Sequence, residues 1–440
     1  MLEGFNEFLW SVPVLGLILM TGIWLTVRTG FAQLRLFPAA CREFWCRMKS
    51  RDSGFRALCT ALAATVGTGN IAGVAGAIAI GGPGAVFWMW VSAFLGLIVK
   101  FAEGTLAVRY REPDGRAGPM YIIREGLGKR WHGLAGAYSF FGIIAAFGVG
   151  NATQINAVIS SLESTGAGRG FVLTVGFVLA AVVALMVTGG ARRITGAAEA
   201  LVPVVSAIYI FVCLGALLLR WEGIGGVFAD IFQGALKPQA VTGGAVGSMM
   251  TAMRIGVSRG TFTNEAGMGT AAIAHGGAQV DHPVRQGLMG IMEVFLDTMV
   301  ICTLTALVIL TSGICVPYGT QAGAELTAGA LSMAFGPWIR ALLCGCLVLF
   351  ALATILGWGY YAGRCAEYLF GSVNWKWFGC LQGAAVLLGL FLKTQTIWTL
   401  AEIVNGLMAV PNLVAVLMLS GEVKRLTEQW KMCYNRSHRQ

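Results

Sequence analysis

The chain has 440 residues, of which 56% are hydrophobic and only 12% are charged. Soluble domains carry about 25% charged residues, so this composition excludes a soluble globular fold. The apolar residues form continuous runs rather than the short alternating strands of a transmembrane barrel. Most of the formal charge of +10 falls in short connections between these runs, where it sets membrane topology, and we expect no nucleic-acid partner.

A helix needs about 20 apolar residues to cross the hydrocarbon core of a bilayer, and a chain in lipid must pair its own backbone groups. The sequence therefore predicts an all-α integral membrane protein with about eleven transmembrane helices. The eleven apolar runs are Trp10–Val27, Phe55–Ile80, Ala85–Val108, Leu134–Leu162, Phe171–Val187, Ala197–Leu219, Ala245–Ala272, Gly287–Leu310, Trp338–Tyr361, Phe378–Leu392 and Ile397–Leu419.

Basic residues alternate between the two ends of these runs. The connections after odd-numbered runs, and the tail, are rich in them, for example Arg28, Arg109, Arg192, Arg285 and Arg364. The other connections hold only Arg169, Arg220, Lys237, Lys393 and, at a boundary, Arg340. The positive-inside rule then predicts an outside N-terminus and a cytoplasmic C-terminus. Free thiols follow the same topology, with Cys41, Cys46, Cys365 and Cys433 in the cytoplasm and Cys315 facing outward.

Two runs contain glycine-rich polar segments that a plain membrane helix would avoid, at residues 65–73 and 258–269. Both contain a Gly-Thr step, then an Asn and then an Ala-Gly step, with spacings that differ by one residue. Glycine lets a helix unwind inside the membrane, and the freed amide and carbonyl ends attract a carboxylate and a cation. Such backbone is tolerated only beside a cavity. Close helix packing through Gly69 and Gly73 is the alternative interpretation.

The two breaks lie at matching depth in runs of opposite direction, which predicts an inverted repeat. One extra N-terminal helix precedes two five-helix repeats. The predicted divisions are residues 1–54 for the first helix and its basic connection, 55–222 for the first repeat, 223–419 for the second repeat and 420–440 for a cytoplasmic tail.

Several stretches resemble the alanine/glycine:cation symporter family of prokaryotes, in family order and over most of the chain. They are VGTGNIAGVAGAIAIGGPGAVFWMW at 66–90, KFAEGTLAVRYR at 100–111, GPMYII at 118–123, RGTFTNEAGMGTAAIAH at 259–275, FLDTMVICTLTALVILTSG at 295–313 and LGWGYYAGRCAEYLFG at 356–371. The resemblance implies a leucine-transporter-like fold.

The resemblance also implies a function. It is sodium-coupled symport of small neutral amino acids such as alanine or glycine into the cell, by alternating access across the prokaryotic cytoplasmic membrane. A proton-coupled symporter, or one for glutamine or serine, stays open as the alternative. A channel would need a pore lined by polar rings, and no catalytic or phosphate-binding pattern indicates an enzyme.

The resemblance assigns the substrate site to six residues. The amides of Gly67, Thr68 and Gly69 would receive the substrate carboxylate, and Gln154 would contact the substrate. Phe262 and Trp358 would wall the space around a small side chain.

Sodium is the expected co-transported ion, and a nearly dehydrated sodium ion needs hard oxygen ligands. The candidates are the Thr354 hydroxyl, the Asn70 amide and the carbonyls of Ala63 and Val66. Asn70 could instead cap the broken helix, and Thr354 could bond back to its own helix.

Some residues depart from the family pattern or lie in apolar runs without a clear role. Ala353 and Gly359 stand where the family commonly has a hydroxyl residue, and Glu293 stands in a usually apolar stretch. Charges in apolar runs are costly, so Lys100, Glu103, Arg254, Arg259, Glu265 and Asp297 should find partners. Arg259 and Glu265 in the second break are candidate gate residues, and the histidines are placed in connections or the tail, without a metal.

Overall fold

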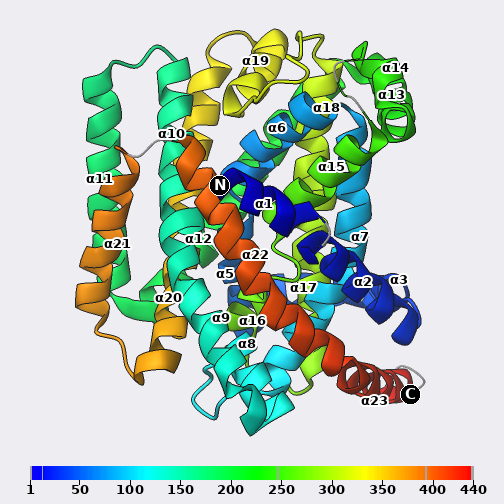
Figure 1. Ribbon diagram of the computed structural model, residues 1–440, viewed down its shortest axis with the longest axis vertical. Helices are drawn as coiled ribbons and strands as arrows, with labels where there is room; N and C mark the ends of the chain where they lie inside the picture. Colours follow the sequence, from blue (N-terminus) through cyan, green and yellow to red (C-terminus); the bar gives the residue numbers. More distant parts are fainter. Residues whose placement is uncertain (1, 12, 245, 247, 392–393, 438–440) are drawn as a thin grey trace.

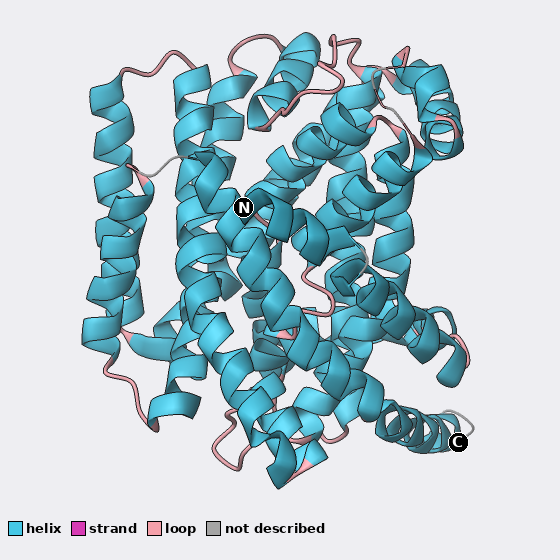
Figure 2. Cartoon of the chain, viewed as in Figure 1, coloured by secondary structure: helices cyan, strands magenta, loops and turns pink. Residues whose placement is uncertain are grey.

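The computed structural model describes residues 2–11, 13–244, 246, 248–391 and 394–437, and in these ranges every regular element is a helix (Figure 2). The long helices stand roughly side by side, with shorter helices covering both ends of the bundle (Figure 1). Ala245, Leu392 and Lys393, which enter the predicted runs and topology, lie outside the described residues.

The predicted runs all fall on helices. The elements of the first half are α2 (Pro13–Arg28), α5 (Ser53–Thr65), α6 (Ala72–Gly81), α7 (Gly84–Arg109), α9 (His132–Ala145), α10 (Thr153–Ser164), α11 (Arg169–Thr188) and α12 (Gly190–Leu218). Those of the second half are α15 (Met249–Asn264), α16 (Thr270–His275), α17 (Pro283–Val294), α18 (Thr303–Thr311), α20 (Ile339–Phe370), α21 (Trp375–Gly389) and α22 (Thr394–Met418).

Among the described residues, eight helical segments are long and apolar enough to cross a membrane, and nine if the bent pair α5–α6 counts as one span. The α15–α16 pair and α21 do not reach that length and hydropathy. The all-α membrane fold is therefore confirmed, while the count of eleven spans and the division into two repeats stay predictions.

Short helices complete the chain. They are α1 (Leu2–Ser11), α3 (Ala32–Arg35), α4 (Phe37–Ser50), α8 (Pro119–Tyr121), α13 (Ile224–Leu236), α14 (Pro238–Thr242), α19 (Ala324–Phe335) and α23 (Ser420–Ser437). In Figure 1 α13, α14 and α19 lie at the upper end of the bundle, and α8 and α23 at the lower end. We call the lower end the basic end, because the basic connections 28–56 and 109–130 and the tail helix lie there.

Both predicted breaks are present. Helix α5 ends at Thr65, a short turn η1 (Thr68–Asn70) follows, and the two arms differ in direction by 59°. In the second break the backbone has positive φ at Glu265, Gly267 and Gly269. Glycine adopts that region without strain, which explains the two glycines, whereas Glu265 is a strained position.

The four arms pair crosswise. Arm α6 packs against α15, and α5 packs against α16. In Figure 1 the first pair lies in the upper half of the bundle and the second in the lower half. Two polar breaks thus meet in the middle of the fold, as an inverted arrangement requires.

Two helices widen near these breaks. The segments η4 (Ala146–Ala152), between α9 and α10, and η6 (Phe295–Cys302), between α17 and α18, are π-helical. A π-helical turn carries one extra residue and is frequent at functional sites. These two turns set the direction of Gln154, two residues beyond η4, and of Asp297 within η6.

Candidate substrate and sodium site

The first break is held by Asn70. Its Oδ1 accepts a hydrogen bond of 2.8 Å from the Gly67 amide, and its Nδ2 donates to Asp297 Oδ1 at 2.7 Å and to the Asp297 carbonyl at 3.2 Å. Asn70 is buried. The geometry matches the capping role that the sequence left open. The Asn70 amide oxygen, which a sodium ion would need as a ligand, already accepts the hydrogen bond from Gly67.

Thr68 and Gln154 meet across the bundle. The Thr68 hydroxyl donates to Gln154 Oε1 at 2.8 Å, and both side chains are buried. Two residues assigned to the substrate site from sequence, 86 positions apart, are therefore direct neighbours. Their hydrogen bond links the first break to α10.

Thr354 faces the same place from α20. A methyl group built on Gly67 would lie 2.5 Å from Thr354 Oγ1 and 3.5 Å from Gln154 Oε1, so both side chains lie on the open side of Gly67. The Thr354 hydroxyl is buried and, within the described part of the chain, has no hydrogen-bond partner. A buried hydroxyl without a partner is costly unless a ligand satisfies it.

The end of α5 lies close to the same helix. A methyl group on Gly357 would lie 2.9 Å from the Ala64 amide nitrogen, so α20 and α5 are in backbone contact there. Ala63 and Val66 are buried on either side of Ala64. Because the last carbonyls of a helix lack partners within it, this end of α5 has carbonyl oxygens to offer beside Thr354.

Trp358 is buried one helical turn after Thr354, where its side chain packs against Gly150 and stacks edge-on to Tyr361 at 5.9 Å between ring centroids. Its side chain lies beside the Glu265 carboxylate of the second break. Phe262 is half-buried on α15. Trp358 therefore joins the two breaks, and the role of both aromatics as walls stays a prediction.

Most of the charges in the apolar runs have partners, whereas Arg254 is exposed. Lys100 pairs with Glu293 at 2.8 Å, and Arg259 with Glu402 at 3.5 Å. Glu103 Oε1 accepts hydrogen bonds from the Asn412 amide and from two backbone amides of the second break. Arg259 and Glu265, the two candidate gate residues, have separate partners, since Glu265 accepts a 2.6 Å hydrogen bond from Thr270.

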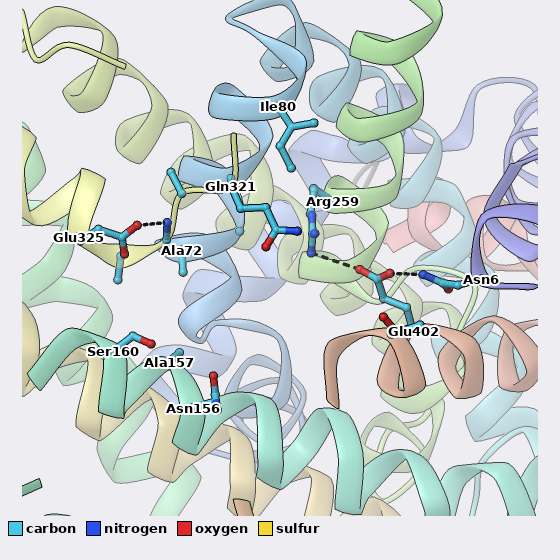
Figure 3. A pocket seen from close by; sticks show the side chains of 16 residues that line it. Asn6, Ala72, Ile80, Asn156, Ala157, Ser160, Arg259, Gln321, Glu325 and Glu402 are labelled. Atoms are coloured by element: carbon cyan, nitrogen blue, oxygen red, sulfur yellow. Dashed lines mark hydrogen bonds and ion pairs between the residues drawn. The ribbon is translucent and has the colours of Figure 1, made fainter. Parts of the chain in front are cut away.

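A cavity of about 530 Å³ opens above the breaks, lined by residues of α6, α10, α15, α19 and the preceding loop (Figure 3). It reaches Ala72 and Gly73, the first residues after the first break. On one side of it the Glu402 carboxylate accepts a 2.6 Å hydrogen bond from Asn6 as well as the ion pair from Arg259. This link could not be predicted from the sequence, because it joins α1 to α22 across almost the whole chain.

Two sequence-based placements are wrong. His275 was assigned to a connection between helices, but it is the last residue of α16 and is fully buried. Cys365 was likewise placed in a connection, whereas α20 continues to Phe370 and buries it. Both errors arise because helices continue beyond the apolar runs when polar residues find partners inside the bundle.

Two interrupted helices that meet at mid-depth beside a cavity define the class of secondary transporters. Among solved structures, MhsT in complex with L-phenylalanine matches with a TM-score of 0.52, over 86% of this chain and 89% of MhsT, at 17% identity. That likeness shows the fold alone, and it confirms the leucine-transporter-like architecture.

Comparison of the sequence is more specific. The sodium/alanine symporter AgcS of Methanococcus maripaludis is 41% identical over 431 residues, which cover 95% of this chain and 94% of AgcS. The probable sodium/glutamine symporter GlnT of Bacillus subtilis is 39% identical over 429 residues, which cover 94% and 87%. The model of the sodium:alanine symporter family matches residues 1–440. The chain belongs to this family, so it is a transmembrane amino-acid symporter and not an enzyme.

Proposed function

We propose that this symporter carries small neutral amino acids, with alanine and glycine the first candidates, into the cell together with sodium. The observation that supports this most is the convergence of the Gly67 backbone, Gln154 Oε1 and the unpartnered Thr354 hydroxyl at the first break. The backbone supplies polarity without side-chain bulk, which suits a small zwitterion and a small cation side by side.

In this proposal the first break binds the substrate carboxylate. Amides of Thr68 and Gly69 begin the next helical arm, where the helix dipole favours an anion. The amide of Gly67 already donates to Asn70, so its part requires that bond to be exchanged for the ligand. Gln154 then orients the substrate by the same oxygen that now accepts from Thr68.

The sodium ion is proposed to lie between α5 and α20. Thr354 is its side-chain ligand, and carbonyls at Ala63 and Val66 are further ligands. Asn70 is the weaker candidate, because both ends of its amide have protein partners. A carboxylate bound nearby would favour the cation, so substrate and ion should bind cooperatively.

Phe262→Ala should weaken alanine binding about fivefold, or about 1 kcal/mol, because a half-buried ring beside a small substrate contributes packing. The same variant should accept larger neutral amino acids. The matched control is Phe211→Ala, which removes a ring that is 73% exposed on α12. An unchanged substrate profile in well-folded Phe262→Ala would show that this ring serves only in helix packing.

The proposed orientation has the N-terminus outside and the basic end in the cytoplasm of a prokaryotic cell. A membrane-impermeant maleimide applied to intact cells should then label Cys315 and leave Cys46 and Cys433 unlabelled, although all three are exposed in the structure. Opening the cells should expose Cys46 and Cys433. Labelling of Cys433 before the cells are opened would show that the C-terminus faces outward and would contradict the proposed orientation.

Glutamine is the second candidate substrate, since GlnT is nearly as similar to this chain as AgcS. The deciding experiment is uptake of labelled alanine by proteoliposomes under an inward sodium gradient, with unlabelled competitors. We expect alanine and glycine to compete more strongly than glutamine, serine or phenylalanine. Stronger competition by glutamine would overturn the substrate assignment and leave the transport mechanism in place.

A further inference from the structure

Glu293 occupies the centre of a buried polar cluster that the substrate and sodium sites do not use. Its Oε1 accepts from Lys100 Nζ at 2.8 Å, and its Oε2 lies 2.9 Å from His275 Nε2. All three side chains are fully buried. They come from three helices, α7, α16 and α17. The Glu293 carboxylate therefore contacts both the Lys100 ammonium and the His275 imidazole.

The hydrogen bonds define the form of the imidazole. Nε2 of His275 faces a carboxylate, which only accepts, so this nitrogen carries a proton. Nδ1 lies 2.7 Å from Gln286 Nε2, which only donates, so Nδ1 is the bare nitrogen and the ring is neutral. The neutral form has both ring nitrogens satisfied in this arrangement.

Gln286 also has the hydrogen-bond acceptor that the charged form of His275 would need. Its Oε1 is buried and has no hydrogen-bond partner among the described residues. Rotation of the amide would exchange the two ends and present this oxygen to Nδ1, where it would accept a second N–H from the ring. The site can therefore satisfy either form of His275 by the turn of one amide, with Glu293 unchanged.

Charged and titratable groups surround the cluster. The groups that act on the Lys100–Glu293–His275 cluster from the packed elements are Glu103 of α7, Glu265 of the second break, Asp297 of η6 and Tyr361 of α20. Toward the basic end follow Glu43 and Arg47 of α4, Asp52 before α5, and Arg285 of α17. Close to the cluster one ammonium faces several carboxylates, and a buried excess of negative charge is relieved by a bound proton.

A polar path leads from the cluster to the surface of the basic end. Gln286 Nε2 lies 3.4 Å from the Gly54 carbonyl in the first turn of α5, and the Gly54 amide donates to Asp52. Asp52 pairs with Arg47 at 2.8 Å, and its side chain is 39% exposed. Gln286 thus contacts both His275 and the start of α5. The other end of α5 carries the proposed sodium site.

We infer that His275, Glu293 and Gln286 form a proton-binding site, separate from the substrate and sodium sites, which takes its proton from the basic end of the bundle. Histidine is the side chain that ordinarily changes charge between pH 5 and 8. Rotation of the Gln286 amide replaces a donor by an acceptor at Gly54, so the attachment of α5 differs between the two forms. Transport then depends on pH at that end of the protein.

Nitrogen-15 NMR of the full-length protein in nanodiscs, labelled on histidine, tests the site without requiring transport. The chain has only four histidines, and His275→Gln assigns the signal. We expect the His275 ring to pass from one protonated nitrogen to two as pH falls from about 8.5 to about 5. In Glu293→Gln the midpoint should fall by at least about one pH unit, a tenfold weaker hold on the proton.

Gln286→Met is a second variant, which keeps the ion pair and removes both ends of the amide, so each form of the ring loses its partner at Nδ1. The charged form loses the stronger, charge-assisted hydrogen bond, so the midpoint should again fall. His282, which caps the start of α17, is the internal control and should titrate identically in all variants. A His275 ring that stays neutral over the whole range would overturn the inference. So would a midpoint that neither Glu293→Gln nor Gln286→Met changes.

Discussion

Replacing Thr354 by valine should raise the half-saturating sodium concentration for alanine uptake at least about tenfold, which corresponds to at least about 1.4 kcal/mol for one lost ligand. Valine keeps the shape of threonine and removes the hydroxyl oxygen, which is buried without a hydrogen-bond partner among the described residues. Reciprocal linkage then lowers the apparent affinity for alanine when sodium is limiting, and saturating sodium should largely restore it.

The measurement is alanine uptake against sodium concentration in proteoliposomes, for the wild type, Thr354→Val and Thr354→Ser. Serine retains the hydroxyl and is the matched control, so its sodium dependence should stay near that of the wild type. An unchanged half-saturating concentration in Thr354→Val would place the ion elsewhere, with Asn70 the next residue to test.

The largest expected effect on stability is that of Lys100→Met. Removal of one partner from a buried ion pair leaves the other charge uncompensated and costs about 3–5 kcal/mol. Glu293 would keep only its hydrogen bond to His275 among the contacts described above, so a substantial loss of thermal stability should follow. The double variant Lys100→Met with Glu293→Leu removes both charges and should recover most of that loss.

Thermal unfolding of the purified protein in one detergent measures both variants. Lys424→Met is the control, because Lys424 is half-exposed and pairs loosely with Glu428 at 3.8 Å, so its effect should stay within about 0.5 kcal/mol. An equal loss of stability in the single and double Lys100 variants would show that lost packing, and not the unpaired carboxylate, is responsible.

The pattern of apolar runs and glycines was enough to predict the helices and both breaks. Apolar length is a local property, and the glycines at 267 and 269 occupy positive-φ positions that other residues rarely adopt. The count of eleven spans stays a prediction, since α21 and the α15–α16 pair, which correspond to two of the predicted runs, do not reach the length and hydropathy of the other spans.

The partners of polar residues could not be predicted, because they depend on helix packing between distant segments. The cap that Asn70 forms is local, whereas its bond to Asp297 spans 227 positions. Glu293 was visible only as a charge in an apolar stretch, and its link to Lys100 spans 193 positions. The roles of the candidate substrate and sodium residues rest on resemblance, and the structure adds that Gly67, Thr68, Gln154 and Thr354 are neighbours.

The central claim, coupled entry of a neutral amino acid with sodium, is tested most directly by current. Proteoliposomes adsorbed on a solid-supported membrane are exposed to alanine in sodium or in choline buffer, and the charge displaced is recorded. A neutral zwitterion that moves with sodium carries positive charge, so alanine should evoke an inward positive current in sodium and none in choline. Alanine currents of equal size in choline, or alanine uptake that proceeds in sodium without any current, would contradict the account.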